Sequence, residues 1–180
     1  MKRITLLFCF LTFSMIALGA DIVRFWEQYS DAEKYHIIES GAIEASIVGI
    51  YDDSFEIGDN EETFKILDYL SEYKYGIHTD GIVDAFYIHC FSIILRKADG
   101  ALSEVMGDYC MRIIKKSSNY AILYLRAHEE IKDAFVMHIG FEVYCSDNQD
   151  RIYENLRECL KLNPSFAEEF VTAVKNWVRK

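Results

Sequence analysis

The 180-residue chain has a single proline, Pro164, and no low-complexity or linker-like stretch. It also has no run in which apolar and polar residues alternate between turn signals, the pattern of a half-buried strand. Apolar residues recur instead at three- and four-residue steps along nearly the whole chain, which is the helical period. These features indicate one all-α domain.

The helical pattern divides into about seven segments, joined by short connections that favour antiparallel hairpins. The expected helices cover residues 30–52, 59–73, 79–99, 101–118, 119–145, 149–162 and 163–180. Ser30 and Glu33 form a capping-box pattern, and Asn163-Pro164 is a helix-start signal. Apolar residues keep the helical phase throughout the fifth segment, which favours one long helix. Two short helices that happen to align are the alternative. Because no regular repeat emerges, the arrangement is a compact bundle or an irregular stack of helical pairs.

Residues 1–20 lack acidic side chains and have the three parts of a cleavable signal peptide. Lys2 and Arg3 form the positive start, residues 4–16 the apolar run, and Ala17, Gly19 and Ala20 the small residues. This run is shorter than the roughly 20 residues that a membrane-spanning helix needs. We therefore expect cleavage after Gly19 or, with a poorer fit, after Ala20. The product would be a single helical domain over residues 21–180, periplasmic or extracellular, with no stable membrane anchor.

Basic residues are the minority, with 19 Lys and Arg against 29 Asp and Glu, for a formal net charge of −10. Loss of Lys2 and Arg3 with the signal peptide would make the charge −12. Nucleic acids and anionic lipids are bound through Lys and Arg, so this balance argues against both as partners. It fits a basic protein partner or a cation, and solubility alone accounts for it as well.

No Cys-x-x-Cys pair is present, so neither a zinc ribbon nor a thioredoxin-type redox site is indicated. Loss of Cys9 with the signal peptide would leave four cysteines, an even number that permits disulfides in an oxidising compartment: Cys90, Cys110, Cys145 and Cys159. Cys90 and Cys110 lie ten residues either side of Gly100, so a hairpin turning there would place them at the same height. We expect Cys90–Cys110 as the better-placed bridge, worth about 3 kcal/mol, and Cys145–Cys159 as the poorer one. Four buried free thiols are the alternative.

Sequence motifs for catalysis are lacking, including the Gly-x-Ser-x-Gly nucleophile turn and a phosphate-binding glycine loop. His89 stands beside Cys90, but adjacent helical residues point about 100° apart and do not face one another. His89 is therefore read as a core histidine, and no catalytic or cofactor-binding residue is predicted.

Metal-site motifs are incomplete. His128-Glu129-Glu130 begins like a zinc-protease helix, but Lys132 stands where the second histidine is required. Glu33 and His36 match one Glu-x-x-His element of a di-iron bundle, yet the chain has no second such element. No metal ligand is therefore predicted.

An acidic loop over residues 53–60 invites comparison with a calcium-binding loop, because Gly58 could stand at the sixth position. Phe55 and Ile57 would then occupy ligand positions, so a solvated acidic loop is the better interpretation.

Tyrosines are also frequent in the first half of the chain. Most are expected at the edge of the core, and a few on one face would suit a protein-binding surface.

Two short stretches carry a resemblance to known proteins: Trp26-x3-Ser30-x3-Lys34, and Tyr73-Lys74-Tyr75-Gly76-Ile77 ahead of a further helix. Over residues 26–95 they loosely resemble the opening of small exported bacterial helical proteins, among them the periplasmic immunity proteins that neutralise type VI secretion amidases. Those proteins usually carry paired cysteines in their N-terminal part, whereas residues 21–89 of this chain have none. No functional residue is transferred from them.

The function expected from the sequence is non-enzymatic protein–protein contact by an exported helical module, in an inhibitor or immunity-like role and without a cofactor. One alternative is a hydrolase or lyase whose site has no recognisable motif, with inward polar residues such as His89 or His138 as its first candidates. The other is a small-ligand carrier with an aromatic pocket between helices.

Overall fold

The computed structural model describes residues 23–76 and 81–180, and these residues are helical throughout, without strands. After the 3-10 helix η1 (Trp26–Gln28) come nine α-helices: α2 (Asp31–Glu39), α3 (Ala45–Tyr51), α4 (Glu61–Glu72), α5 (Gly81–Lys97), α6 (Gly100–Lys116), α7 (Ser118–Ala127), α8 (Glu129–Cys145), α9 (Gln149–Cys159) and α10 (Pro164–Val178). The all-α prediction is confirmed. The expected signal peptide and the first residues of the helix expected over 79–99 lie outside the described residues, and no described helix is long and apolar enough to span a bilayer.

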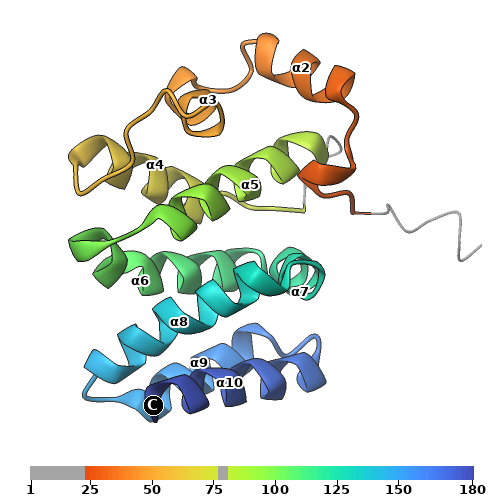
Figure 1. The fold of residues 1–180 in the computed structure, drawn as a ribbon. Helices are drawn as coiled ribbons and strands as arrows, with labels where there is room; N and C mark the ends of the chain where they lie inside the picture. The colour runs from red at the N-terminus through yellow and green to blue at the C-terminus, as the bar shows by residue number, and fades with distance from the viewer. Residues whose placement is uncertain (1–22, 77–80) are drawn as a thin grey trace, which may run out of the picture.

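The helices are stacked in layers, from α2 and α3 at one end to α9 and α10 at the other (Figure 1). Two helices act as hubs. Helix α5 packs against η1, α2, α3 and α4, while α8 packs against α6, α7, α9 and α10. The hubs contact each other, and α4 also packs against α6, so one continuous core joins the two ends.

The described residues form nine α-helices where seven were expected, because two breaks interrupt segments whose apolar pattern keeps its phase. The first separates α2 from α3 at Gly41, whose φ of 69° suits a residue without a Cβ atom. The hydroxyl of Ser40 donates to the carbonyl of Ile37 at 2.7 Å and accepts from the amide of Ala42 at 3.2 Å. These bonds satisfy backbone groups that the end of the helix would otherwise leave unpaired.

The second break divides the expected long helix 119–145 at His128, whose φ and ψ are −127° and 86°. The backbone amide of His128 donates to the carbonyl of Tyr124 at 3.0 Å, and its own carbonyl accepts from the amide of Lys132 at 3.0 Å. His128 therefore ends α7 and begins α8. The interpretation as one helix is wrong because side-chain contacts of this histidine, described below, stabilise the break.

Both predicted helix-start signals are confirmed. The hydroxyl of Ser30 accepts from the amide of Glu33 at 3.4 Å, and the carboxylate of Glu33 accepts from the amide of Ser30 at 2.8 Å. At the start of α10 the side chain of Asn163 accepts from the amide of Phe166, with Pro164 as the first helical residue.

The four cysteines in the described part of the chain are free thiols, so neither expected bridge is formed in the structure. The hairpin argument for Cys90 and Cys110 required α5 and α6 to pack as a close pair. Helix α6 packs instead mainly against α8 and α4, while α5 packs most closely against α3. The Sγ of Cys90 lies 3.7 Å from the carbonyl oxygen of Ile47 on α3. Cys145 is exposed and Cys159 is half-buried.

Candidate functional site

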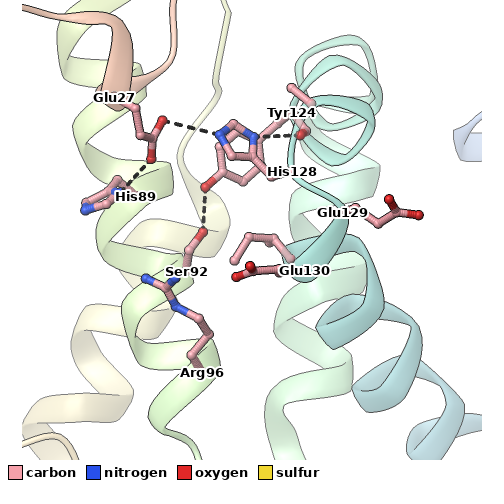
Figure 2. A pocket seen from close by; sticks show the side chains of 10 residues that line it. Glu27, His89, Ser92, Arg96, Tyr124, His128, Glu129 and Glu130 are labelled. Atoms are coloured by element: carbon pink, nitrogen blue, oxygen red, sulfur yellow. Dashed lines mark hydrogen bonds and ion pairs between the residues drawn. The ribbon is translucent and has the colours of Figure 1, made fainter.

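The first candidate site is a cleft of about 370 Å³ between η1, α5 and the α7–α8 break (Figure 2). Glu27 enters it from η1, and His128 and Glu130 line it from the break. His89, Ser92 and Arg96 line it from α5, because residues three and four apart lie on one face of a helix. We call it the Glu27 cleft.

Glu27 bridges the two histidines of this cleft. One carboxylate oxygen lies 3.3 Å from Nδ1 of His89, and the other lies 3.3 Å from Nε2 of His128. The Nδ1 of His128 lies 2.9 Å from the carbonyl oxygen of Tyr124. Both ring nitrogens of His128 thus lie beside oxygen atoms. The contact with Glu27 links the segment of chain before α2 to the break between α7 and α8.

The pKa values of Glu27 and His89 are both lowered, and the surroundings of each side chain explain the shift. Burial would raise the pKa of Glu27, but hydrogen bonds from the backbone and from His128, with the charges of His128 and His89, lower it overall. Burial lowers the pKa of His89, and the neighbouring Glu27 offsets only part of that effect. A neutral His89 can still donate through Nδ1 to Glu27.

Aromatic contacts hold Glu27 in place, because its neighbours anchor the segment 23–30, which we call the strap. Trp26 is buried, with its ring centroid 4.9 Å from that of Phe86 on α5. Phe25 meets the edges of Tyr124 and His128 at centroid distances of 5.4 and 5.0 Å. The strap therefore joins the two sides of the cleft.

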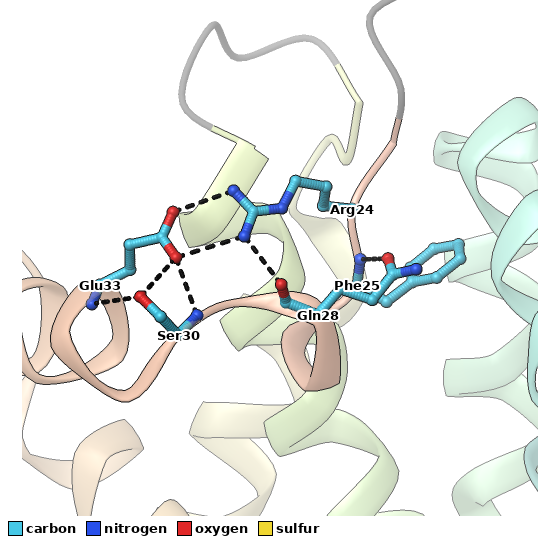
Figure 3. Close-up of polar contacts among 5 residues, drawn as sticks. All are labelled: Arg24, Phe25, Gln28, Ser30 and Glu33. Atoms are coloured by element: carbon cyan, nitrogen blue, oxygen red, sulfur yellow. Dashed lines mark hydrogen bonds and ion pairs between the residues drawn. The ribbon is translucent and has the colours of Figure 1, made fainter.

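Polar contacts within the strap fix its conformation (Figure 3). The guanidinium of Arg24 donates to the carboxylate of Glu33 at 2.9 Å and to the carbonyl of Gln28 at 2.8 Å. The side chain of Gln28 accepts from the amide of Phe25 at 2.7 Å. Hydrogen bonds from Arg24 and then Ser30 lower the pKa of Glu33 to about 2. The carboxylate of Glu33 is therefore held in this network.

The hydroxyl groups of the Glu27 cleft are paired with each other. The Oγ of Ser92 donates to the carbonyl of Ile88 at 2.8 Å, so the hydroxyl of Tyr124, 2.7 Å away, is its donor. Burial raises the pKa of Tyr124 to about 12, which keeps the phenol protonated. The hydroxyl of Ser92 is thus held between the carbonyl of Ile88 and the hydroxyl of Tyr124.

The histidine and cysteine that are adjacent in the sequence face different neighbours, as their helical spacing predicts. His89 faces Glu27, whereas Cys90 faces α3. His138 is buried, with Nδ1 3.2 Å from the carbonyl of Ser103 and with Nε2 lacking a partner in the described part of the chain. Among the described residues no group of three metal-ligating side chains converges.

A second candidate site is a groove of about 330 Å³ between α3 and α4, which both pack against α5. We call it the α3–α4 groove. Its lining is Glu44, Ser46, Ile47, Phe55, Glu62, Lys65, Ile66 and Tyr69. Ile47 and Ile66 belong to the core and Phe55 is half-buried, while Tyr69 is 43% exposed. Tyr69 is thus one tyrosine in the described part that presents its ring at the surface, as expected for a few of them.

The groove lies within the most acidic part of the chain. Residues 39–72, here called the acidic segment, contain ten carboxylates and one cation, Lys65. Four of these carboxylates form ion pairs, namely Asp53 with Lys97, Glu61 with Lys65, Asp68 with Arg112 and Glu72 with Lys116. The other six have no ion-pair partner in the described part of the chain: Glu39, Glu44, Asp52, Glu56, Asp59 and Glu62. The predicted acidic loop is confirmed as a loop between helices.

Several functional candidates escape sequence reasoning. Glu27 is an isolated acid before the first helix, and nothing in its spacing links it to His89 or His128, which lie 62 and 101 residues further on. The α3–α4 groove uses a helix, α3, that the break at Gly41 separates from α2. The signal that could have revealed it is the glycine itself.

Comparison with known proteins adds no constraint to this geometry. We found no significant match to the chain among protein-family models, curated proteins or solved structures.

Proposed function

We propose that this protein acts by binding a basic partner protein, without catalysing a reaction. The single observation that carries the proposal is the uneven placement of charge. Within the described part of the chain, six carboxylates of the acidic segment lack ion-pair partners, and two of them, Glu44 and Glu62, line a groove that also exposes an aromatic ring. Concentrated charge of one sign attracts and orients an oppositely charged partner.

An inhibitor or immunity-like role is one concrete form of this function. Such a protein needs a rigid surface complementary to its target, and the stacked helices with a fixed loop supply a scaffold of that kind. The signal-like residues 1–20 fit a partner met outside the cytoplasm, so we propose that the domain is exported.

The test is capture of partners by the tagged protein from the exported fraction of its own cells, with two variants of equal charge. The segment variant combines E44Q, E56Q, D59N and E62Q. The distal variant combines E104Q, D133N, D147N and E154Q, which are carboxylates of the second half without ion pairs in the described structure. Both change the formal charge from −10 to −6.

We expect the wild type and the distal variant to retain the same basic protein, released by raised salt, and the segment variant to lose it. Equal recovery by both variants would contradict the proposal. Circular dichroism would check that each variant is folded.

A further inference from the structure

The α3–α4 groove has walls whose positions are set before any partner arrives. One wall is the loop that carries Phe55, whose amide donates to the carbonyl of Gly49 at 2.9 Å. A Cβ atom on Gly49 would stand 3.1 Å from the Cβ of Phe55, so the missing side chain allows the loop to lie directly against α3. The ion pair of Asp53 with Lys97 ties the same loop to the end of α5.

The other wall is α4, whose first turn is fixed by its cap. The side chain of Asn60 accepts from the amide of Thr63 at 2.8 Å, and the buried hydroxyl of Thr63 accepts from the amide of Gly58 at 3.3 Å. Tyr69 lies two turns further along the same helix, with its hydroxyl 3.3 Å from that of Tyr87. A surface fixed in this way loses little conformational entropy on binding.

The groove has a charged rim, formed by Glu44 and Glu62, and an apolar floor, formed by Phe55 and Ile66. Glu44 and Glu62 stand at the rim, are exposed and have no ion-pair partner in the described part of the chain. The cation of the groove, Lys65, is paired with Glu61 at 2.6 Å. Phe55 and Tyr69 add aromatic surface, and aromatic faces attract both apolar groups and cations.

We propose that the α3–α4 groove docks a basic amphipathic segment of the partner protein, which deepens the proposed function and rests on it. Apolar side chains of this segment lie against Phe55 and Ile66, while its Lys or Arg side chains meet Glu44 and Glu62. Charge complementarity selects this occupant, because an acidic segment would be repelled by the two free carboxylates and by the rest of the acidic segment. The pairing of an apolar floor with a charged rim is typical of grooves that bind amphipathic peptides.

The test uses a synthetic peptide of lysine and leucine spaced so that the leucines lie on one helical face. A scrambled peptide of the same composition and charge, without that face, is the matched probe. Affinities are measured by fluorescence anisotropy for the wild type, for the rim variant E44Q/E62Q, and for E39Q/E56Q, which removes two carboxylates of the same acidic segment outside the groove. The variant F55A tests the floor.

We expect the wild type to prefer the amphipathic peptide over the scrambled one. The rim variant should lose about tenfold in affinity, as for two exposed charge pairs, and E39Q/E56Q about twofold or less. F55A should remove most of the preference for the amphipathic peptide.

Equal losses in the two double variants, with no preference between the peptides, would overturn the groove while leaving the proposed function intact, because charge alone would then account for binding. Absence of binding to either peptide at low salt would count against both. Self-association that the rim variant abolishes, measured by sedimentation velocity, would assign the groove to a second copy of the chain and would also overturn the proposal.

Discussion

The two halves of the chain differ in charge and in packing. Residues 1–99 contain 17 carboxylates and 8 Lys and Arg, whereas residues 100–180 contain 12 and 11. In the second half, Gly107 and Gly140 let helices approach so closely that an added Cβ would stand 2.6 Å from a carbonyl oxygen of α8 and 2.4 Å from the ring of Trp177. In the first half, α3 and α4 leave a groove between them. The comparison separates the proposed binding surface from the rest of the scaffold: residues 100–180 are nearly neutral and contain these close helix contacts, whereas residues 1–99 are acidic and contain the α3–α4 groove.

The largest effect is expected where the packed half is overfilled. Gly107→Ala places a methyl group 2.6 Å from the carbonyl oxygen of His138 and 2.8 Å from the Cβ of Glu142. Backbone cannot move aside cheaply, so we expect a loss of about 3 kcal/mol in the free energy of unfolding, measured by urea denaturation. Gly58→Ala is the control, because its Cβ would meet only the side-chain nitrogen Nδ2 of Asn60, at 3.6 Å. Equal stabilities of the two variants would refute the difference in packing.

The response to acid should distinguish a buried histidine from an exposed one. Burial lowers the pKa of His138, and likewise that of His89, so stability is full above the unfolded-state pKa of about 6.5 and is lost as pH falls through the lower folded-state values. Carboxylates titrate at lower pH, so a decline in stability that begins just below pH 6.5 is due to the histidines. We expect His138→Gln to make the decline in stability shallower, and the exposed control His36→Gln to leave it unchanged. A decline of unaltered steepness in His138→Gln would show that this histidine is not responsible.

A smaller effect is expected at the strap that joins the halves. Glu27→Gln removes the charge that bridges His89 and His128 but keeps the size of the side chain. Since Glu27 is half exposed, the loss of stability should be about 1 kcal/mol or less. The pKa of His89 should fall further, because the charge that partly offsets its burial is gone. NMR titration of the histidine ring protons checks this shift, and an unchanged pKa would mean that Glu27 is not in contact in solution.

The smallest effect on stability is expected in the groove. Gly49→Ala gains helix propensity, but its methyl group presses on Phe55 and on the Oγ of Ser54 at 3.2 Å. These contributions oppose each other, so stability should change by less than about 1 kcal/mol. The affinity for the amphipathic peptide should nevertheless fall several-fold as the loop is displaced. Unchanged affinity together with unchanged stability would show that the position of this loop does not matter.

Sequence reasoning predicts the all-α class and many of the helix boundaries because apolar periodicity and capping residues act locally. Ser30 with Glu33 and Asn163 with Pro164 place helix starts correctly for that reason. Local patterns miss the break at His128, since the side chain that stabilises it contacts Glu27 about a hundred residues earlier.

The candidate sites are less predictable than the helices. The expectation of a Cys90–Cys110 bridge assumed that helices adjacent in sequence pack as close partners, whereas α6 packs mainly with α8 and α4. The acidic loop is visible in the sequence, but the groove beside it requires Glu44 and Glu62 to meet across two helices. That juxtaposition depends on tertiary packing, which no local pattern encodes.

The central claim, that the acidic half carries the binding surface, is tested most directly by the salt dependence of binding. The affinity of the amphipathic lysine–leucine peptide would be measured from 50 to 300 mM salt for the wild type, the segment variant and the distal variant. The account predicts that the segment variant binds weakly with a shallow dependence on salt, and that the distal variant keeps both the affinity and the slope of the wild type. The same slope and affinity in both variants, which have equal net charge, would contradict it.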